Sequence, residues 1–101
     1  MRHLLLGIER IEFVGGGKTL VAGRCCGDDL VAGDQATQVV RMCEGEVVES
    51  VDLHEPIEMT GFHLYGEEHS VAYAGYTVAV YLPNEVAIGL PFGWYFSGEN
   101  E

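Results

Sequence analysis

Lysine and arginine are scarce in this chain and disappear from its second half. The 101 residues include five Lys or Arg against 16 Asp or Glu, so the net charge is −11. All five cations lie in residues 1–41, whereas residues 42–101 carry eleven acids and no Lys or Arg. Nucleic-acid binding depends on cationic contacts to phosphate, so nucleic acid is an unfavourable partner. A basic protein would be attracted, although the same charge also serves solubility alone.

Long apolar runs are missing as well. The run at residues 4–8 is shorter than the roughly seven residues that a signal peptide needs, and nothing approaches the ~20 of a membrane span. Cysteine is present in an odd number, three, and Cys25 and Cys26 are adjacent, so they would point to opposite faces of a strand. We expect reduced thiols in a cytoplasmic protein that does not contact membranes.

The length and composition predict one all-β domain covering residues 1–101. Hydrophobic residues make up 48% of the chain, enough for a core without metal or disulfides. Its 14 glycines and five tyrosines suit turns and strands. Runs of strand type separated by turn residues occur at 4–14, 19–26, 35–43, 46–53, 61–65, 70–74, 76–82, 86–88 and 94–96. Such short, regularly spaced strands predict a small closed antiparallel β-barrel of six to eight strands.

One segment, residues 46–58, fits two kinds of structure. Its acids recur every third residue, as they would along one face of a helix. Val47, Val51 and Leu53 also fit a strand, and Pro56 is expected to end either element.

A glycine-rich segment resembles part of a phosphate-binding loop. Residues 15–19 read Gly-Gly-Gly-Lys-Thr, like the end of G-x-x-x-x-G-K-[ST], but the first glycine of that motif would fall on Glu12. The following residues have a strand pattern, whereas a phosphate loop leads into a helix. We therefore predict a hairpin turn. With no other nucleophile or triad pattern, we expect no catalytic residue, no cofactor and no enzymatic activity.

Histidines offer a metal-binding alternative. His54, His63 and His69 lie near the carboxylates Glu67 and Glu68, among others, but lack the spacing of a known zinc motif. His63 and His69 flank a predicted turn at 66–68, so they would be able to face one another across a hairpin. The default prediction is surface histidines and no metal.

The aromatic run at residues 92–96 is denser than a surface requires. It either contributes to the core or forms an exposed partner site. Together with the acidic segment it supplies the candidate binding residues, which are Glu46, Glu49, Asp52, Glu55, Phe92, Trp94 and Tyr95.

The order of turns and strands resembles a known family. The matching segments are Ile11-Glu12-Phe13, Gly17-Lys18-Thr19-Leu20-Val21-Ala22-Gly23-Arg24, Gly27, Leu30-Val31-Ala32-Gly33-Asp34, Ile57-Glu58-Met59, Ala74-Gly75-Tyr76-Thr77-Val78-Ala79-Val80-Tyr81-Leu82 and Val86-Ala87-Ile88-Gly89. This order is similar to the second-domain β-barrel of translational GTPases such as elongation factor Tu, here without a GTPase domain. The resemblance implies the barrel fold and suggests transfer-RNA binding as an alternative, which the charge opposes. It assigns no binding residue to this chain.

These observations lead to one functional expectation. The chain is predicted to be a non-catalytic module that binds another, basic protein through its acidic surface. RNA binding and metal binding are the alternatives, and the sequence leaves the oligomeric state open.

Overall fold

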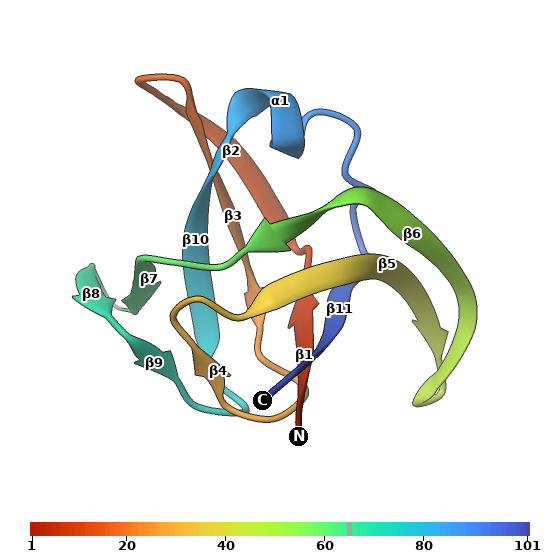
Figure 1. The fold of residues 1–101 in the computed structure, drawn as a ribbon. Helices are drawn as coiled ribbons and strands as arrows, with labels where there is room; N and C mark the ends of the chain where they lie inside the picture. Colours follow the sequence, from red (N-terminus) through yellow and green to blue (C-terminus); the bar gives the residue numbers. More distant parts are fainter. Residues whose placement is uncertain (65) are drawn as a thin grey trace.

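Eleven strands and one short helix make up the described part of the chain, residues 1–64 and 66–101 of the computed structural model (Figure 1). In chain order they are β1 (Arg2–Gly7), β2 (Arg10–Gly15), β3 (Lys18–Arg24), β4 (Leu30–Val31), β5 (Gln35–Cys43), β6 (Glu46–Glu58), β7 (Phe62–Leu64), β8 (Glu67–His69), β9 (Val71–Ala72), β10 (Thr77–Pro83), α1 (Asn84–Ala87) and β11 (Tyr95–Asn100).

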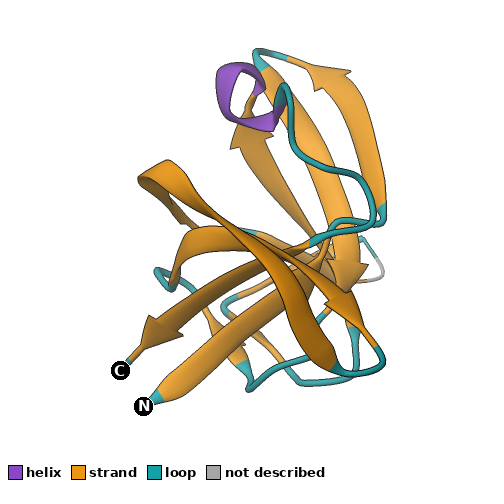
Figure 2. Ribbon diagram, turned by 90° about the vertical axis from the view of Figure 1, so that its right-hand side faces the viewer, coloured by secondary structure: helices purple, strands orange, loops and turns teal. Residues whose placement is uncertain are grey.

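The strands form three antiparallel sheets. Their orders are β1-β11-β5-β6, β2-β3-β10-β7-β8 and β4-β9. The two larger sheets form separate layers, and the two chain ends lie side by side (Figure 2). The largest fully buried side chains include Phe62, Phe96, Leu6, Ile8 and Met59. The predicted all-β, antiparallel architecture is confirmed. Over the described residues no sheet closes on itself, so the closed barrel stays a prediction.

The run at residues 4–14 was expected to be a single strand, and that expectation is wrong. The chain leaves the four-stranded sheet after Gly7 and joins the five-stranded sheet at Arg10. The N–H of Glu9 donates to the Ala22 carbonyl at 2.9 Å, which starts the new pairing. Gly23 permits this crossing, because a Cβ there would lie 1.8 Å from the Gly7 carbonyl oxygen.

The strand expected at residues 86–88 is also wrong. Asn84–Ala87 forms the one-turn helix α1, which begins after Pro83 at φ −55° and buries Ala87. A local apolar pattern of three residues does not distinguish a strand from a helical turn. Two other predicted strands differ in extent. Residues 70–74 contain only β9, and residues 94–96 overlap the longer β11, which begins at Tyr95 and leaves Trp94 outside. The strand predicted at 61–65 is β7, and residue 65 lies outside the described residues.

The ambiguous acidic segment is a strand along its whole length. β6 pairs antiparallel with β5, and Pro56 does not end it. Ala36 faces Ile57 and Gln38 faces Asp52, so residues 53–56 stand opposite a single residue of β5. In such a bulge a proline interrupts no regular ladder hydrogen bond, which is why the strand continues.

The glycine-rich segment is the predicted hairpin turn. Gly15, Gly16 and Gly17 have φ of 89°, 64° and 75°, and Gly15 pairs with Lys18. The chain then continues as β3 rather than as a helix. No helix N-terminus is therefore available here to hold phosphate.

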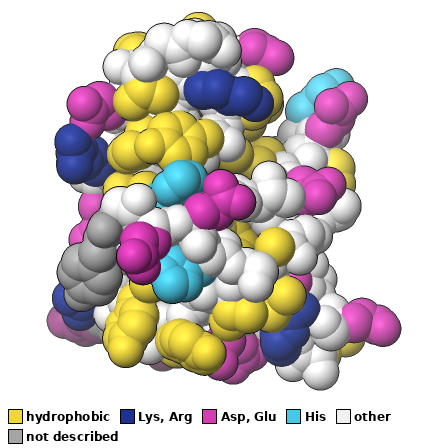
Figure 3. All heavy atoms as spheres, turned by 90° about the vertical axis from the view of Figure 1, so that its left-hand side faces the viewer, with side chains coloured by type: hydrophobic (Ala, Val, Ile, Leu, Met, Phe, Trp, Pro, Cys, Tyr) yellow, Lys and Arg dark blue, Asp and Glu magenta, His cyan; other side chains and the backbone are white. Residues whose placement is uncertain are grey.

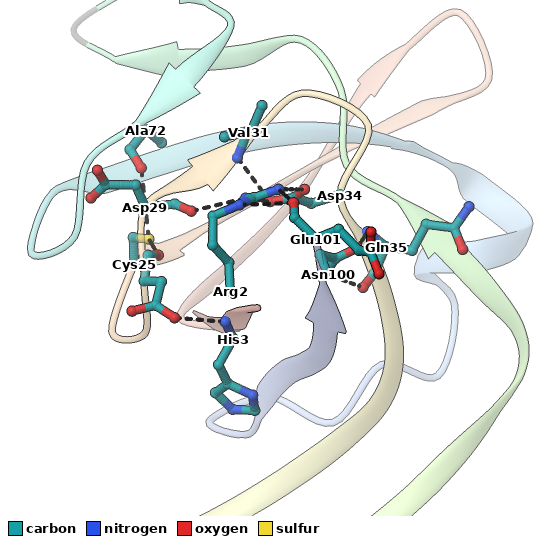
Figure 4. A network of polar contacts seen from close by, with 11 residues as sticks. Arg2, His3, Cys25, Asp29, Val31, Asp34, Gln35, Ala72, Asn100 and Glu101 are labelled. Atoms are coloured by element: carbon teal, nitrogen blue, oxygen red, sulfur yellow. Dashed lines mark hydrogen bonds and ion pairs between the residues drawn. The ribbon is translucent and has the colours of Figure 1, made fainter.

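A partly buried ion pair ties the two chain ends to the loop before β5 (Figure 4). The Arg2 guanidinium donates to both Asp34 carboxylate oxygens, at 2.5 and 2.7 Å, and to the Glu101 carbonyl. The Val31 N–H donates to the same carboxylate at 2.9 Å. Burial raises the pKa of Asp34, but these hydrogen bonds and the charge of Arg2 lower it by more, so the pKa lies below its ordinary 3.8.

Candidate functional site

The acidic strand β6 lies at the edge of its sheet. Over the described residues its only strand partner is β5. Side chains 46–52 are exposed on both faces of the strand, including Val47, Val48 and Val51. An exposed edge strand presents unpaired N–H and C=O groups that can accept another strand.

All four predicted acidic site residues lie on β6, but the structure divides them into two pairs. Glu49 accepts a hydrogen bond from Arg41 Nη2 at 2.9 Å, and Asp52 accepts one from Gln38 Nε2 at 2.8 Å. Glu46 and Glu55 make no side-chain hydrogen bond or ion pair with any described residue. Because side chains alternate along a strand, a spacing of three places these acids on both faces of β6.

The three predicted aromatic site residues do not form one patch. Phe92 is 70% exposed in the loop before β11, whereas Trp94 packs against the core. Tyr95 faces a different cavity, which it lines with Leu5 and Met42. The predicted aromatic surface is therefore divided. Trp94 and Tyr95 are adjacent in the chain and point in different directions, while Phe92 lies in the turn formed with Gly93, whose φ is 86°.

Trp94 and β6 meet in an apolar cavity of about 370 Å³. It opens between β6 and the segment that follows α1, and no charged or hydroxyl-bearing side chain lines it. The lining residues are Val39, Val51, Leu53, Val86, Ile88, Gly89, Leu90, Pro91 and Trp94. A second cavity, of about 470 Å³, shares Leu53 and Val86 with the first and is bordered by Lys18, His54, Glu55 and Glu58. We call the two together the β6 groove.

The sequence did not reveal this groove. Residues 86–90 and residues 51–53 are more than 30 positions apart, and each looks like ordinary strand sequence. The one available signal was Pro83-Asn84-Glu85 followed by the apolar stretch at 86–88, which does not alternate and is compatible with a helical turn and a loop.

The histidines are not brought together. Across the β7–β8 hairpin, His63 pairs with Glu68 and His69 pairs with Phe62, so the two rings lie on opposite faces. His63 stacks edge-on against Tyr81 at 4.9 Å, and His54 lies on β6. Across residues 1–64 and 66–101, no three His, Cys, Asp or Glu side chains are arranged to hold a metal ion.

A second surface lies on the outer face of the five-stranded sheet, where Figure 3 shows hydrophobic and histidine side chains close together. A shallow depression of about 760 Å³ is bordered there by Arg10, Arg24, His63, Tyr76 and Tyr81, among others. No local pattern indicates this grouping, because its residues come from β2, β3, β7, β10 and the turns beside them. Arg10 is already paired with Glu12.

The three cysteines are free thiols in different surroundings. Cys25 is buried, whereas its neighbour Cys26 and Cys43 are exposed, as the predicted alternation requires for the adjacent pair. Burial raises the pKa of the Cys25 thiol, so its reactive thiolate is disfavoured.

No protein-family model matches the chain, and no curated protein matches it significantly. The described part of the chain contains no helix long and apolar enough to cross a membrane.

Proposed function

We propose that this chain is a non-catalytic module that binds an extended, basic segment of another protein along the free edge of β6. The observation that carries the proposal is a 13-residue strand that has one sheet neighbour among the described residues and exposes both faces over residues 46–52. Backbone hydrogen bonds from an added strand would satisfy the open edge, and the flanking side chains would select the sequence.

Charge selects the class of partner. β6 carries five carboxylates, and His54 is its only basic residue. The negative electrostatic potential of these carboxylates accelerates association with cationic partners and disfavours acidic ones. A second copy of the chain is a poor partner, because pairing two β6 strands would place five acids beside five others.

The test is a selection of random 12-residue peptides against the immobilised protein. Enriched peptides should alternate cationic and apolar residues, and their affinity should fall as salt is raised. The variant E46Q/E55Q/E58Q should lose at least about tenfold in affinity. The matched variant E67Q/E68Q/E101Q removes three exposed acids away from β6 and should bind within about twofold of the parent.

Three outcomes would refute the proposal. Equal losses in the two triple variants would indicate unspecific attraction to a negative protein. Enriched peptides without basic residues would remove the charge argument. A dimer that strengthens on neutralising β6 would identify a second copy as the occupant.

The proposal includes two finer expectations. The translation-factor-like barrel is supported by contacts that join the two large sheets, namely the Leu6–Cys25 bridge and the Cys26 N–H donating to the Leu5 carbonyl at 2.8 Å. A cytoplasmic location is supported by three free thiols, which suit a reducing compartment.

RNA binding is the second candidate, and the depression beside Arg10 and Arg24 favours it. Arginine next to Tyr76 and Tyr81 is the combination that stacks bases and neutralises phosphate. A filter-binding assay with transfer RNA at low salt tests it, with R24Q as the variant and R41Q, on the other sheet, as the control. Retention that R24Q abolishes and R41Q preserves would establish this function, and absence of retention would remove it.

A further inference from the structure

The apolar cavity beside Trp94 is open to solvent rather than being an internal void. Val51 and Ile88 line it and are 52% and 69% exposed. Covering such surface with apolar atoms is favourable in proportion to the area removed from water. Occupation of the cavity by an apolar group is therefore favourable.

The size of the cavity indicates a single side chain rather than a cofactor. Its volume of about 370 Å³ is near the lower end of the ~300–1,000 Å³ typical of ligand sites. A dry apolar cavity of ~150 Å³ already admits benzene, so one aromatic or branched aliphatic side chain fits here. The absence of charged lining residues excludes a charged occupant.

The position of the cavity connects it with the strand edge. Val51 and Leu53 belong to β6 itself, and the neighbouring part of the groove is bordered by Glu55 and Glu58. A segment lying along β6 would thus have a cavity for one apolar side chain and carboxylates for its flanking cations.

We infer that the bound segment inserts one bulky apolar side chain, of Leu, Phe or Trp size, into the cavity between Val51, Leu53, Ile88, Leu90 and Trp94. This inference rests on the proposed function and adds to it the recognition motif, a hydrophobic anchor flanked by basic residues. Such buried anchors supply most of the affinity in many interfaces, while the charged rim supplies specificity.

Trp94 provides a direct readout. It is the only tryptophan of the chain and lines the cavity. An anchor that displaces water from the indole should move its emission to shorter wavelength. Peptides without tryptophan must be used, so that the signal comes from the protein.

The experiment is a double-mutant cycle on a selected peptide that lacks tryptophan. Replacing the peptide's anchor by Ala should weaken binding about 10- to 100-fold, equivalent to ~1.4–2.8 kcal/mol, and should abolish the shift in Trp94 emission. V51F places a larger ring at the mouth of the cavity and should weaken the parent peptide to a similar extent. In V51F the anchor-to-Ala change should then have little further effect. V14F alters a similarly exposed valine on β2, in the other large sheet and outside both the cavity and β6, and should bind normally.

Each outcome bears on a different statement. The inference is overturned if V51F binds the peptide as tightly as the parent protein does. It is also overturned if the anchor-to-Ala change weakens binding equally in the parent protein and in V51F. In both cases, binding that depends on the acids of β6 would still support the proposed function. If the Val51–anchor coupling persists but E46Q/E55Q/E58Q binds normally, the basic-partner proposal fails and the anchor cavity stands. If no peptide is enriched, both fail. A Trp94 shift that grows with protein concentration alone would assign the cavity to a second copy and overturn the inference. If V51F is unstable, I88S is the alternative variant. It removes apolar surface from the mouth of the cavity without adding volume, and it should weaken binding of the parent peptide as V51F is expected to do.

Discussion

The crossing of two backbones at Gly7 and Gly23 allows one substitution to be predicted in detail. At Gly23 an added Cβ would lie 1.8 Å from the Gly7 carbonyl oxygen and 2.4 Å from its carbon. Ordinary contacts of a Cβ lie at 3.4–4 Å, so Gly23→Ala requires the two strands to separate by more than 1 Å. The obstacle is backbone, which cannot rotate away like a side chain.

The cost follows from what the separation disrupts. Overpacking by itself costs about 1–3 kcal/mol. The crossing also holds the Glu9–Ala22 and Cys26–Leu5 backbone hydrogen bonds, at 2.9 and 2.8 Å, each contributing about 1 kcal/mol. We therefore expect Gly23→Ala to lower the free energy of unfolding by about 3–5 kcal/mol. For a domain of this size that lowers the melting temperature by at least about 12 °C.

Gly7→Ala is the matched control at the same crossing. A Cβ at Gly7 would meet its nearest atoms at 3.5–3.6 Å, which is ordinary contact. This variant should stay within about 1 kcal/mol of the parent, and the smaller entropy of its unfolded chain even favours it. Urea unfolding followed by circular dichroism measures both variants. The reasoning is refuted if Gly23→Ala costs less than about 1 kcal/mol, or if Gly7→Ala costs as much as Gly23→Ala.

Two further predictions concern Asp34 and the cysteines. The folded-state pKa of Asp34 lies below its ordinary 3.8, so its contribution to stability is complete above that pH and is lost as pH falls through the folded-state value. Urea unfolding between about pH 2 and 6 should show this loss, and D34N should flatten it; an unchanged pH dependence in D34N would contradict the role of the pair. A thiol reagent such as DTNB should modify Cys26 and Cys43 in the native protein and Cys25 only on unfolding, whereas three equal rates would show that Cys25 is accessible.

Local patterns predicted much of the fold. The alternation in residues 76–82 predicts one face made of Tyr76, Val78, Val80 and Leu82. The last three are buried in β10, whereas Tyr76 precedes the strand and is exposed. Glu12 and the strand pattern after Lys18 were sufficient to predict a hairpin rather than a phosphate loop at residues 15–17, where all three glycines adopt positive φ. Both features depend on a few consecutive residues, so the sequence contains the information needed.

Other features depend on partners distant in the chain. The strand pattern at residues 4–14 does not show where the chain crosses from one sheet to the other. The crossing depends on Gly23, a residue outside this segment, which accommodates the Gly7 backbone. Pro56 was expected to end its element, but a bulge opposite β5 accommodates it. Neither outcome follows from local propensity, since the register between two strands is a property of the pair.

The candidate site also combines features that depend on single residues with features that depend on contacts between distant segments. The residue types alone show that residues 46–58 are acidic and that Trp94 belongs to an aromatic run. Only the tertiary structure placed β6 at a sheet edge, turned Trp94 and Tyr95 apart, and brought residues 86–91 against Val51 to form the cavity. Charge and hydrophobicity are properties of single residues and are additive along a chain. An open edge or a cavity exists only where separate segments meet, so it appears only once the sheets are packed.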